Sequence, residues 1–407
     1  MKISYLLTQS LDSPSGLGRY WPLAYQMAKR HHDVEILALH PDIDTLEQKE
    51  FNTRGVHVRY VAPMHVMKMD SQKSYYSPVG LINVSLQATW RLSRAVLQSP
   101  SQIVHIGKPH PMNSLAGWVG KYLMKKNVLL DCDDYEAGSG TFSSNWQRAV
   151  ISYFERTVPR SVKCVTTNTY FMKHKLLSRG VPPERIFYLP NGVERSRFLQ
   201  SGAEEIINLR KKLGLGGKEV VSYIGSMSLA NHAVDLLIKS FPIIKSSRPN
   251  AILILIGGGE NYSDLINLAQ ETGFGESIYF TGRVLPEKVS LYYAISSVTV
   301  DPVYDNDAAR GRSPLKLFES WACGTPFVTG DVGDRKQLIG EPPAGIITKP
   351  GDPEALAAAV VHVLSDQSLA ETLTKRGRDA VEQYYWDQLV VKVESLYRTI
   401  IEYNSAA

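Results

Sequence analysis

Short apolar segments that are typical of strands alternate with helical segments along the first half of the chain, and this alternation most limits the possible folds. Such a pattern is typical of parallel strands joined by crossover helices, with helices on both faces of the sheet. The expected strands are residues 3–7, 34–39, 56–61, 103–106, 128–130, 162–167 and 186–189, and the expected helices are residues 16–30 and 115–126.

The alternation is interrupted by turn residues at 189–193 and a polar stretch to about residue 218, and then it begins again. The chain therefore predicts an α/β protein with two Rossmann-like, doubly wound domains, each able to bind ligands at the carboxyl ends of its strands. We expect the domains at residues 1–195 and 196–385. The second series has expected strands at 220–224, 251–256, 278–281, 297–300 and 325–329, and expected helices at 233–244 and 288–294.

Size and charge exclude several classes of protein. A chain of 407 residues exceeds one ordinary core, and no apolar run approaches the ~18 residues of a membrane span. The amino terminus is too short an apolar run for a secretory signal. Cys132, Cys164 and Cys323 lie far apart without metal-ligand spacing, as in a reduced cytoplasmic protein. A net charge of +5 suits anionic ligands or a membrane surface, and we expect no nucleic-acid partner.

The segment from Ser313 to Val328 places Glu319 within an otherwise apolar helix. A buried carboxylate needs a partner, because losing water without one costs several kcal/mol. Ser313 is expected as the N-cap and Pro314 as the first helical residue. The free N–H groups and the dipole of a helix start attract phosphate. The segment therefore suits a sugar nucleotide, although Glu319 pairing locally with Lys316 or another neighbour remains an alternative.

This segment resembles the nucleotide-binding helix of the retaining GT-B glycosyltransferases, in particular glycosyltransferase family 4. The similarity covers nearly the whole chain and is strongest at residues 165–194 and 220–328. It implies a GT-B fold with an interdomain cleft, whose last helix, at about residues 386–407, returns to the first domain.

The family usually carries two glutamates eight positions apart, of which the second binds the donor ribose. Glu319 matches the second, but Gly311 stands where the first is expected, and Asp307 is the nearest acid upstream. The sequence Ser-Pro-Leu-Lys-Leu-Phe-Glu is similar to a branch of the family that lacks the first acid.

The resemblance implies a diphosphate grip at the start of this helix. The turn at Gly225 is followed in many members by an arginine and a lysine, but Ser226 and His232 stand here. His232 either contacts phosphate or is an ordinary helix-start residue. The loop at Arg283 and Val284 is expected to hold the base edge through its backbone, and Gly257–Gly259 is either a nucleotide loop or a flexible turn. Expected at the phosphates are Arg310, Arg312, Ser313, Leu315 and Lys316, with Lys316 also expected to be catalytic.

In the first domain, the resemblance places Gly16 and Gly18 near the diphosphate, with Arg19 facing either phosphate or solvent. Asp133 and Asp134 follow a central strand where many members carry an important histidine. We expect them to be catalytic, steadying positive charge on the reacting sugar, with loop acids that cap the next helix as the alternative.

With this resemblance, the features predict a glycosyltransferase that moves a sugar from a nucleoside diphosphate sugar to a hydroxyl acceptor. The resemblance further implies retention of the anomeric configuration and no need for a cofactor or a metal. The acceptor could be a lipid-linked glycan, in polysaccharide or glycoconjugate biosynthesis. A non-catalytic scaffold of a polysaccharide assembly complex and a sugar-nucleotide epimerase or hydrolase are the alternatives. A cytoplasmic protein is expected, with contact to the inner face of the membrane or an ordinary solvated surface at Trp90, Arg91, Arg94, Trp118, Lys121, Tyr122, Lys125 and Lys126.

Overall fold

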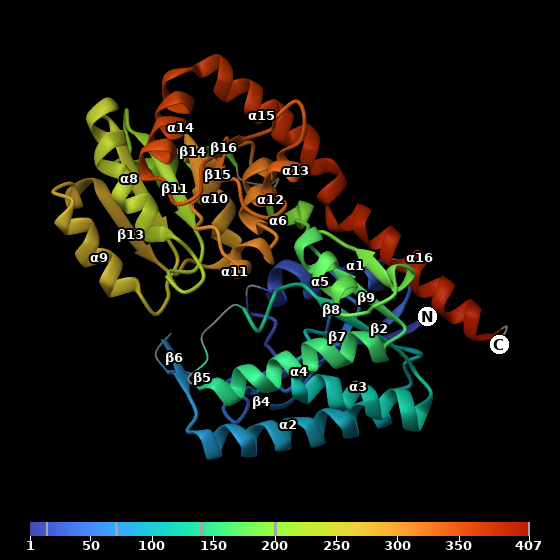
Figure 1. Cartoon of the computed structure of the whole chain (residues 1–407). Coiled ribbons are helices and arrows are strands. Elements are labelled where there is room, and N and C mark those ends of the chain that lie inside the picture. Colours follow the sequence, from blue (N-terminus) through green and yellow to red (C-terminus); the bar gives the residue numbers. More distant parts are fainter. Residues whose placement is uncertain (14, 70–71, 139–141, 143, 199–201, 406–407) are drawn as a thin grey trace. The chain divides into compact units, whose positions relative to one another are not determined.

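The computed structural model describes the chain apart from residues 14, 70–71, 139–141, 143, 199–201 and 406–407 (Figure 1). The chain divides into two compact units. Unit 1 comprises Met1–Gly192 together with Trp386–Ala407, and unit 2 comprises Val193–Tyr385. The boundary expected after residue 195 lies a few residues beyond the one observed.

Within the described residues, unit 1 is built on a sheet of eight strands in the order β10-β9-β8-β7-β1-β2-β4-β3. Neighbouring strands are parallel except β3 and β4, which form an antiparallel edge that the sequence analysis did not predict. A separate hairpin joins β5 and β6. The strands are β1 (Lys2–Leu7), β2 (Asp33–His40), β3 (Glu50–Thr53), β4 (Val56–Pro63), β5 (Val66–Met69), β6 (Gln72–Tyr75), β7 (Ile103–Gly107), β8 (Asn127–Cys132), β9 (Cys164–Thr167) and β10 (Ile186–Tyr188).

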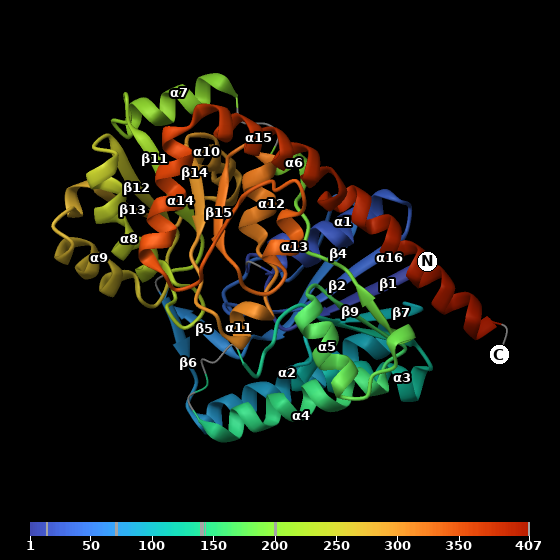
Figure 2. The same cartoon turned by 45° about the horizontal axis from the view of Figure 1, so that its top comes forward.

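Helices cover both faces of this sheet, as alternation of strands and helices requires. Helices α2, α3 and α4 lie side by side over one face, where Ala88, Leu92, Ala116 and Val158 join the core (Figures 1 and 2). Helices α1 and α16 share the other core. The helices of unit 1 are η1 (Gly16–Tyr20), α1 (Trp21–Lys29), α2 (Pro78–Gln98), α3 (Pro111–Met124), α4 (Asn145–Ser161), α5 (Tyr170–Ser178), η2 (Pro183–Arg185) and α16 (Trp386–Ser405).

The last helix, α16, is anchored in unit 1 by buried aromatic residues. Trp386 is fully buried and donates a hydrogen bond from Nε1 to the carbonyl of Gly18 at 3.0 Å. The Tyr397 hydroxyl lies 2.6 Å from His105 Nδ1 and 3.2 Å from the hydroxyl of Tyr5. Burial lowers the pKa of His105 to about 4, so the ring is neutral and adds no charge to this core.

Unit 2 contains, among the described residues, a parallel sheet of six strands in the order β13-β12-β11-β14-β15-β16. The strands are β11 (Glu219–Ile224), β12 (Ala251–Ile256), β13 (Ile278–Gly282), β14 (Val298–Asp301), β15 (Phe327–Gly330) and β16 (Ile346–Thr348). Strand β12 is buried at every position, as expected for a central strand between two helical layers.

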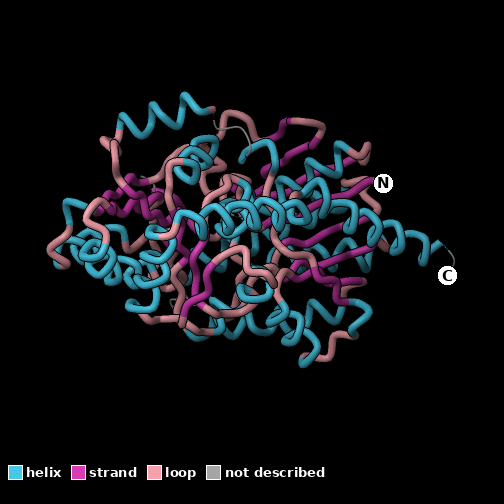
Figure 3. The backbone as a smooth tube through the Cα atoms, turned by 90° about the horizontal axis from the view of Figure 1, so that it is seen from above, coloured by secondary structure: helices cyan, strands magenta, loops and turns pink. Residues whose placement is uncertain are grey.

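Two apolar clusters fill the spaces on either side of this sheet. In each unit the strands lie between helices; Figure 3 shows the strands in magenta and the helices in cyan. The helices of unit 2 are α6 (Arg195–Phe198), α7 (Ala203–Lys212), α8 (Val234–Ser247), α9 (Tyr262–Glu271), η3 (Gly275–Ser277), η4 (Pro286–Lys288), α10 (Val289–Ala294), α11 (Asp307–Arg310), α12 (Leu315–Ala322), α13 (Arg335–Ile339), α14 (Pro353–Ser365), α15 (Gln367–Val381) and η5 (Glu382–Tyr384).

The burial of Trp386 gives a test of how strongly α16 is attached to unit 1. Trp386→Ala should lower the free energy of unfolding of unit 1 by about 3–5 kcal/mol, because it removes a large buried side chain and leaves a cavity. Hydrogen exchange of the β1 and β7 amides, measured by mass spectrometry, should accelerate. Val391→Ala on the exposed side of α16 is the control and should leave exchange unchanged. Equal protection in both variants would contradict the anchoring role.

Candidate active site

The expected donor-site residues of unit 2 gather at the carboxyl edge of its sheet. Strands β11, β12 and β13 are followed there by Gly225, Gly257 and Arg283, and β14 ends at Asp301. Parallel strands bring these ends to one edge, which is the usual ligand-binding edge of a doubly wound sheet. Helix α12 begins beside the same strand ends, because the Lys316 side chain reaches Gly225 and Asp301.

The start of α12 differs by one residue from the expectation. Pro314, with φ −77° and ψ 96°, occupies the N-cap position, and Leu315 is the first helical residue. Ser313 was expected as the N-cap but lies one residue earlier, almost completely buried. The first N–H groups of a helix have no intrahelical acceptor, so those of Leu315 and Lys316 can serve an anion.

Helix α12 is amphipathic, and its outer face carries the expected ligand residues. Leu315, Lys316 and Glu319 are partly exposed, whereas the other residues of the helix are buried. Lys316 and Glu319 are three positions apart and therefore share one side of the helix. The cation lies in the first turn, next to the expected phosphates, and the carboxylate lies in the next turn.

Glu319 has a specific partner within unit 2. The hydroxyl of Tyr293, on α10, donates a hydrogen bond to Glu319 Oε2 at 2.8 Å. Burial raises the pKa of Glu319, while nearby Arg197, the Tyr293 hydrogen bond and Lys316 oppose this shift. The structure therefore gives Glu319 a protein partner, as the alternative allowed, but this partner is Tyr293 and not Lys316. The tyrosine bond leaves carboxylate capacity for a ligand hydroxyl.

Lys316 belongs to a three-member charge cluster with Asp301 and Arg335. Lys316 Nζ lies 3.1 Å from Asp301 Oδ1, and the Arg335 guanidinium lies 2.9 Å from Oδ2. Both cations hold the pKa of the buried Asp301 well below its usual range, against the effect of burial. Since one carboxylate meets two cations, the cluster carries a net positive charge at the start of α12.

Gly225 is required by the close approach of Lys316. A Cβ at this position would lie 2.7 Å from Lys316 Cε, so a larger residue would displace the lysine. Lys316 Nζ also lies 5.0 Å from the centre of the Tyr223 ring, a cation–π contact that helps to fix the ammonium. The glycine, the tyrosine and the carboxylate of Asp301 together orient this lysine.

His232 and Arg312 lie beside this cluster. Burial lowers the pKa of His232 well below its usual value, and the positive charges of Lys316 and Arg312 add to the effect. The ring is therefore neutral and can donate one hydrogen bond. Arg312 is held by Asn231, to which it donates hydrogen bonds at the backbone carbonyl and, at 3.0 Å, at Oδ1.

Arg310 is directed elsewhere. Its guanidinium forms a bidentate pair with Asp305 at 2.7 and 2.8 Å, and it also lies 3.8 Å from Asp307. The expectation that Arg310 supplies charge to the phosphates is therefore weakened, because two acids on its own segment already compensate it. Asp307 lies on the exposed surface of the same segment.

The glycine run after β12 is needed for close backbone approach. A Cβ on Gly257 would lie 1.9 Å from the carbonyl oxygen of Gly225, and one on Gly259 would lie 2.4 Å from that of Met227. Arg283 lies over Gly258, at 3.1 Å from a Cβ built there. Backbone hydrogen bonds join the loops that follow β11, β12 and β13. The glycine run is therefore a packed loop and not a flexible turn.

Arg19 of unit 1 faces neither phosphate nor solvent. It is 2% exposed and forms a bidentate ion pair with Asp131 at 2.6 and 2.7 Å. Its remaining nitrogen donates to Asn191 Oδ1 at 2.9 Å and to the carbonyl of Leu189 at 3.2 Å. Both alternatives stated for Arg19 are wrong, because the buried Asp131 requires a cation and Arg19 supplies it.

The two glycines before Arg19 are also packed within unit 1. A Cβ on Gly16 would lie 2.5 Å from the carbonyl oxygen of Ser10, so the backbone there tolerates no side chain. The Gly18 carbonyl accepts the hydrogen bond of Trp386. Their expected approach to a diphosphate stays a prediction.

Asp133 and Asp134 lie at the carboxyl edge of the unit 1 sheet, around the ammonium of Lys108. Lys108 Nζ lies 2.5 Å from Glu136, 2.8 Å from Asp134 and 3.5 Å from Asp133. The carboxylates are close enough together to hold a metal ion, and the lysine supplies the positive charge among them. They pair with Lys108 and do not begin the next helix, α4, which follows Ser144.

Lys108 adopts an uncommon backbone conformation to reach this place. Its φ is +70°, in the left-handed region, which costs a residue other than glycine about 1–3 kcal/mol. Its amide donates to the carbonyl of Asp131 at 3.0 Å, which fixes the turn after β7. The attraction between the Lys108 ammonium and the surrounding carboxylates offsets the cost of this backbone conformation.

Charge balance explains why one of these acids holds a proton. Three carboxylates face one ammonium, and Asp133 is the most buried of the three and the farthest from Lys108. Burial raises the pKa of Asp133 to about 8, with the negative charges of Asp134 and Asp131 adding to the shift. Lys108 and His110 hold the pKa of Glu136 well below its usual range.

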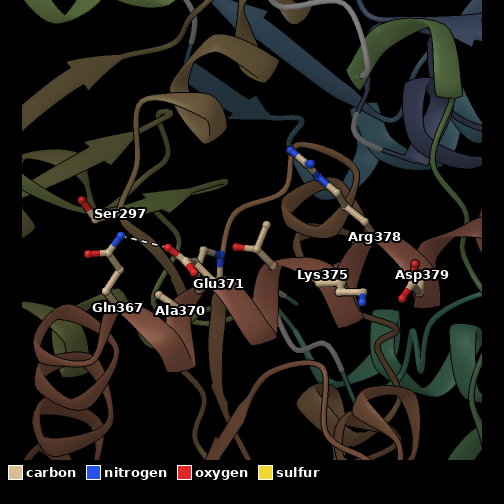
Figure 4. Close-up of a pocket in the computed structure, with 9 residues that line it drawn as sticks. Ser297, Gln367, Ala370, Glu371, Lys375, Arg378 and Asp379 are labelled. Carbon is tan, nitrogen blue, oxygen red and sulfur yellow. Dashed lines mark hydrogen bonds between the residues drawn. The ribbon is translucent and has the colours of Figure 1, made fainter.

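A hollow of about 540 Å³ lies on a different part of unit 2, along α15 (Figure 4). Ser297 and Pro326, which line it, directly precede β14 and β15, so the hollow lies at the amino ends of these strands. Arg378 from the same hollow packs against Gly324, beyond the carboxyl end of α12. The hollow is therefore at the edge of the sheet opposite the start of α12.

Sequence reasoning missed the residues that hold the expected ones in place: Tyr293, Asp301, Arg335, Asn231 and Lys108. Asp301 and Lys108 carried a detectable signal, because each is a charged residue at the carboxyl end of a buried strand. Tyr293, Asn231 and Arg335 lie on helices or loops without such a signal, and only the tertiary structure brings them to the site.

Comparison with known proteins agrees with this architecture. The model of the "Glycosyl transferase 4-like domain" matches residues 15–192, and that of "Glycosyl transferases group 1" matches residues 205–380. Sucrose-phosphate synthase of Thermosynechococcus elongatus has a TM-score of 0.76 at 19% identity, over 99% of this chain and 100% of that one. HepE of Anabaena, solved with UDP and glucose, has a TM-score of 0.76 at 13% identity, over 98% and 100%. The fold is thus that of a GT-B protein.

Curated relatives extend the similarity to sequence. A GDP-mannose-dependent alpha-(1-6)-phosphatidylinositol monomannoside mannosyltransferase of Mycobacterium tuberculosis is 26% identical over 311 residues, 76% of this chain and 78% of that protein. An uncharacterized glycosyltransferase of Methanocaldococcus jannaschii is 23% identical over 391 residues, 93% of each chain. The chain belongs to the GT-B glycosyltransferases and is similar to glycosyltransferase family 4.

The shifted pKa of Asp133 gives a stability test. Unfolded aspartate has a pKa near 4, whereas Asp133 in the folded chain has one of about 8. Between these values the folded state keeps a proton that the unfolded state releases, so stability falls as pH rises through this window and then levels off. Asp133→Asn should therefore gain stability over the native chain by up to about 1.4 kcal/mol per pH unit.

Urea unfolding at several pH values measures this difference. Glu271→Gln, an exposed site on unit 2, is the control and should show no such trend. A stability difference for Asp133→Asn that does not change between pH 5 and pH 8 would contradict the protonated state.

Proposed function

We propose that the protein transfers a sugar from a nucleoside diphosphate sugar to a hydroxyl acceptor, with retention of the anomeric configuration. The observation that supports this most directly is the outer face of α12, where Lys316 and Glu319 lie one turn apart beside free helix-start amides. An anion at the helix start and a pair of hydroxyls at the carboxylate describe the diphosphate and ribose of such a donor.

In this proposal the phosphates lie at the amino end of α12. Lys316, Arg312 and the amides of Leu315 and Lys316 bind them, and neutral His232 donates a hydrogen bond. Glu319, oriented by Tyr293, accepts from the ribose hydroxyls. The backbone at Arg283 and Val284 holds the base edge. Similar proteins differ in their nucleotide: one is named as GDP-mannose-dependent, and one structure contains UDP. The proposal therefore covers donors with either base.

The reaction breaks the bond between the sugar's anomeric carbon and the diphosphate oxygen and forms one to the acceptor oxygen. Retention requires the new bond on the face that the diphosphate leaves. The acceptor proton passes to the leaving phosphate oxygen. Positive charge at the start of α12 stabilises the developing negative charge of the diphosphate, which lowers the barrier to its departure. Lys316 is the catalytic cation in this scheme, and no metal or cofactor is needed.

The acceptor is assigned to unit 1, with Asp133 and Asp134 close to the reacting sugar. The side chain of Asp134 would stabilise the positive charge that builds on the ring, and a protonated Asp133 would donate a hydrogen bond to an acceptor oxygen. The M. tuberculosis relative is named for a phosphatidylinositol monomannoside acceptor. By this similarity we propose a lipid-linked glycan as the acceptor, in glycoconjugate biosynthesis in the cytoplasm.

A thermal-shift screen with uridine, guanosine, adenosine and thymidine diphosphate sugars tests the proposal. A donor that binds the folded chain raises its melting temperature by mass action. With that donor, nucleoside diphosphate should be released only when an acceptor is present. Release without acceptor would indicate a hydrolase, formation of an epimer would indicate an epimerase, and no binding at millimolar concentration would indicate a scaffold.

Glu319→Ala should lower the affinity for the nucleoside diphosphate about 10- to 100-fold, because a charged hydrogen-bond partner of the ribose contributes about 1.5–3 kcal/mol. Isothermal titration calorimetry measures this loss. Tyr293→Phe keeps the carboxylate but removes its orienting hydrogen bond, so a smaller loss is expected. Unchanged binding by a folded Glu319→Ala variant would refute the ribose role.

Lys316→Met should lower both the affinity for nucleoside diphosphate and kcat, by about 10- to 100-fold in affinity, while leaving the fold intact. The fold should survive because Arg335 still neutralises the buried Asp301. The control is Lys239→Met, which removes an exposed lysine paired with Asp235 on α8. A Lys316→Met variant with native kcat would exclude this lysine from the reaction.

A further inference from the structure

The solvent-facing side of α2 is unusually apolar. The exposed side chains include Val79, Ile82, Leu86, Trp90 and Leu97, and Trp90 and Leu86 are 61% and 64% exposed. Their spacing places them along one face of the helix, opposite the residues that pack on the sheet. A helix on the surface of a soluble domain normally turns its polar face to water, so this face requires a partner.

Helices α3 and α4 continue the same surface. Tyr122, Leu123 and Met124 are exposed at the end of α3, and Trp146 and Tyr153 are exposed on α4. The three helices lie side by side on one face of the unit 1 sheet (Figures 1 and 2). More than half of the large exposed apolar side chains among the described residues lie on α2, α3 and α4. We call the exposed surface of these three helices the apolar-basic face.

The charges on this face have one sign. Within α2, α3 and α4 the sequence has a single acid, Glu155, which is 2% exposed and contacts Arg179. The basic residues of the face point to solvent or are partly exposed: Arg91, Arg94, Lys125, Arg148, Arg156 and Arg160. Lys121, also expected here, donates instead to the carbonyl of Ser161. An ordinary solvated face carries both signs, so a face without exposed acids indicates an anionic partner.

The structure also corrects the composition of this surface. Trp118 and Lys126 were expected on it, but Trp118 donates to Ser161 Oγ at 2.7 Å and Lys126 donates to the carbonyl of Ser99 at 2.7 Å. Both side chains point into unit 1 and support the packing of α3. Exposed apolar residues of α4 and, besides the expected Trp90, of α2 take their place, and these were not evident without the observed helix faces.

A hollow of about 460 Å³ adjoins the face, between α2 and the edge of the sheet. Arg59 and Lys49 line it together with Arg91 and Arg94 of α2, and Glu50 is the acid among the lining residues. The hollow therefore has an excess of positive charge. Trp90 also lines the hollow, so the positive charge of the face continues beyond the helices to Lys49 and Arg59.

We propose that the apolar-basic face docks on the surface of an anionic lipid bilayer. Trp90, Tyr122, Trp146 and Tyr153 supply amphipathic rings that suit the boundary between headgroups and acyl chains. The arginines and lysines attract the anionic headgroups, each contributing near the membrane surface. A second copy of the chain fits less well, because a two-fold interface would place these like charges opposite one another.

No helix among the described residues is long and apolar enough to cross a bilayer, so the contact is one with the surface. Docking depends on no donor or acceptor, and it is measured without either. A failed transfer reaction therefore leaves this inference untouched, and failed docking leaves the proposed transfer untouched.

Co-sedimentation with vesicles tests the docking. The chain should bind vesicles of phosphatidylcholine mixed with phosphatidylglycerol, bind weakly to phosphatidylcholine alone, and dissociate as salt is raised. The variant with Arg94→Gln, Arg148→Gln and Arg156→Gln should bind about 100-fold more weakly, since each basic residue near an anionic surface contributes about fivefold. Trp90→Ser with Tyr153→Ser should bind at least about tenfold more weakly.

The matched control lies on unit 2, where Ile207 is 64% exposed and is followed by two exposed lysines. Ile207→Ser with Lys211→Gln and Lys212→Gln should bind vesicles like the native chain. The proposal is overturned if the native chain does not bind anionic vesicles at low salt, or if the arginine variant binds as well as the control. It is also overturned if sedimentation velocity shows a dimer that Trp90→Ser dissociates while vesicles remain unbound.

Discussion

The pairing of Asp301 with two cations is the interaction on which the candidate donor site depends. A carboxylate buried at the end of β14 is unfavourable unless it is paired. Arg335 of α13 satisfies that requirement, so the charge of Lys316 is only partly compensated. The same carboxylate therefore does two things: it holds Lys316 in a fixed position, and it leaves the start of α12 positive. Gly225 lies close to the lysine in this position, and a side chain there would displace it.

At the carboxyl edge of the unit 1 sheet the balance of charge is the opposite, because acids outnumber cations. Arg19 neutralises Asp131 inside the domain, whereas Lys108 faces three acids. The excess of carboxylates is reduced by a proton on Asp133, whose burial makes ionisation costly. One edge thus carries excess positive charge, and the other keeps more carboxylates than cations. Two sheets of the same type acquire different chemistry from a few charged residues at their strand ends.

The sequence predicted most strands of both sheets and the helix that carries Lys316 and Glu319, because apolar periodicity and turn residues mark these elements directly. It did not predict the short edge strands β3 and β16, which have little apolar signal, or several helices, among them α2, α4, α14 and α15. Glu319 was expected to need a partner, but Tyr293 could not be identified, since tertiary packing alone brings α10 to it. Arg19 and Arg310 show the same limit: a charged residue next to a glycine loop or a helix start is equally suited to a protein carboxylate.

The return of α16 to unit 1 has a consequence for biosynthesis. Unit 2 is inserted between two parts of unit 1, and the chain enters and leaves it side by side, where Val193 forms a bridge with Tyr385. Translation therefore finishes all of unit 2 before the ribosome adds Trp386 and Tyr397. Until then β1 and β7 lack their aromatic cover, so the domain encoded first in the message is completed last.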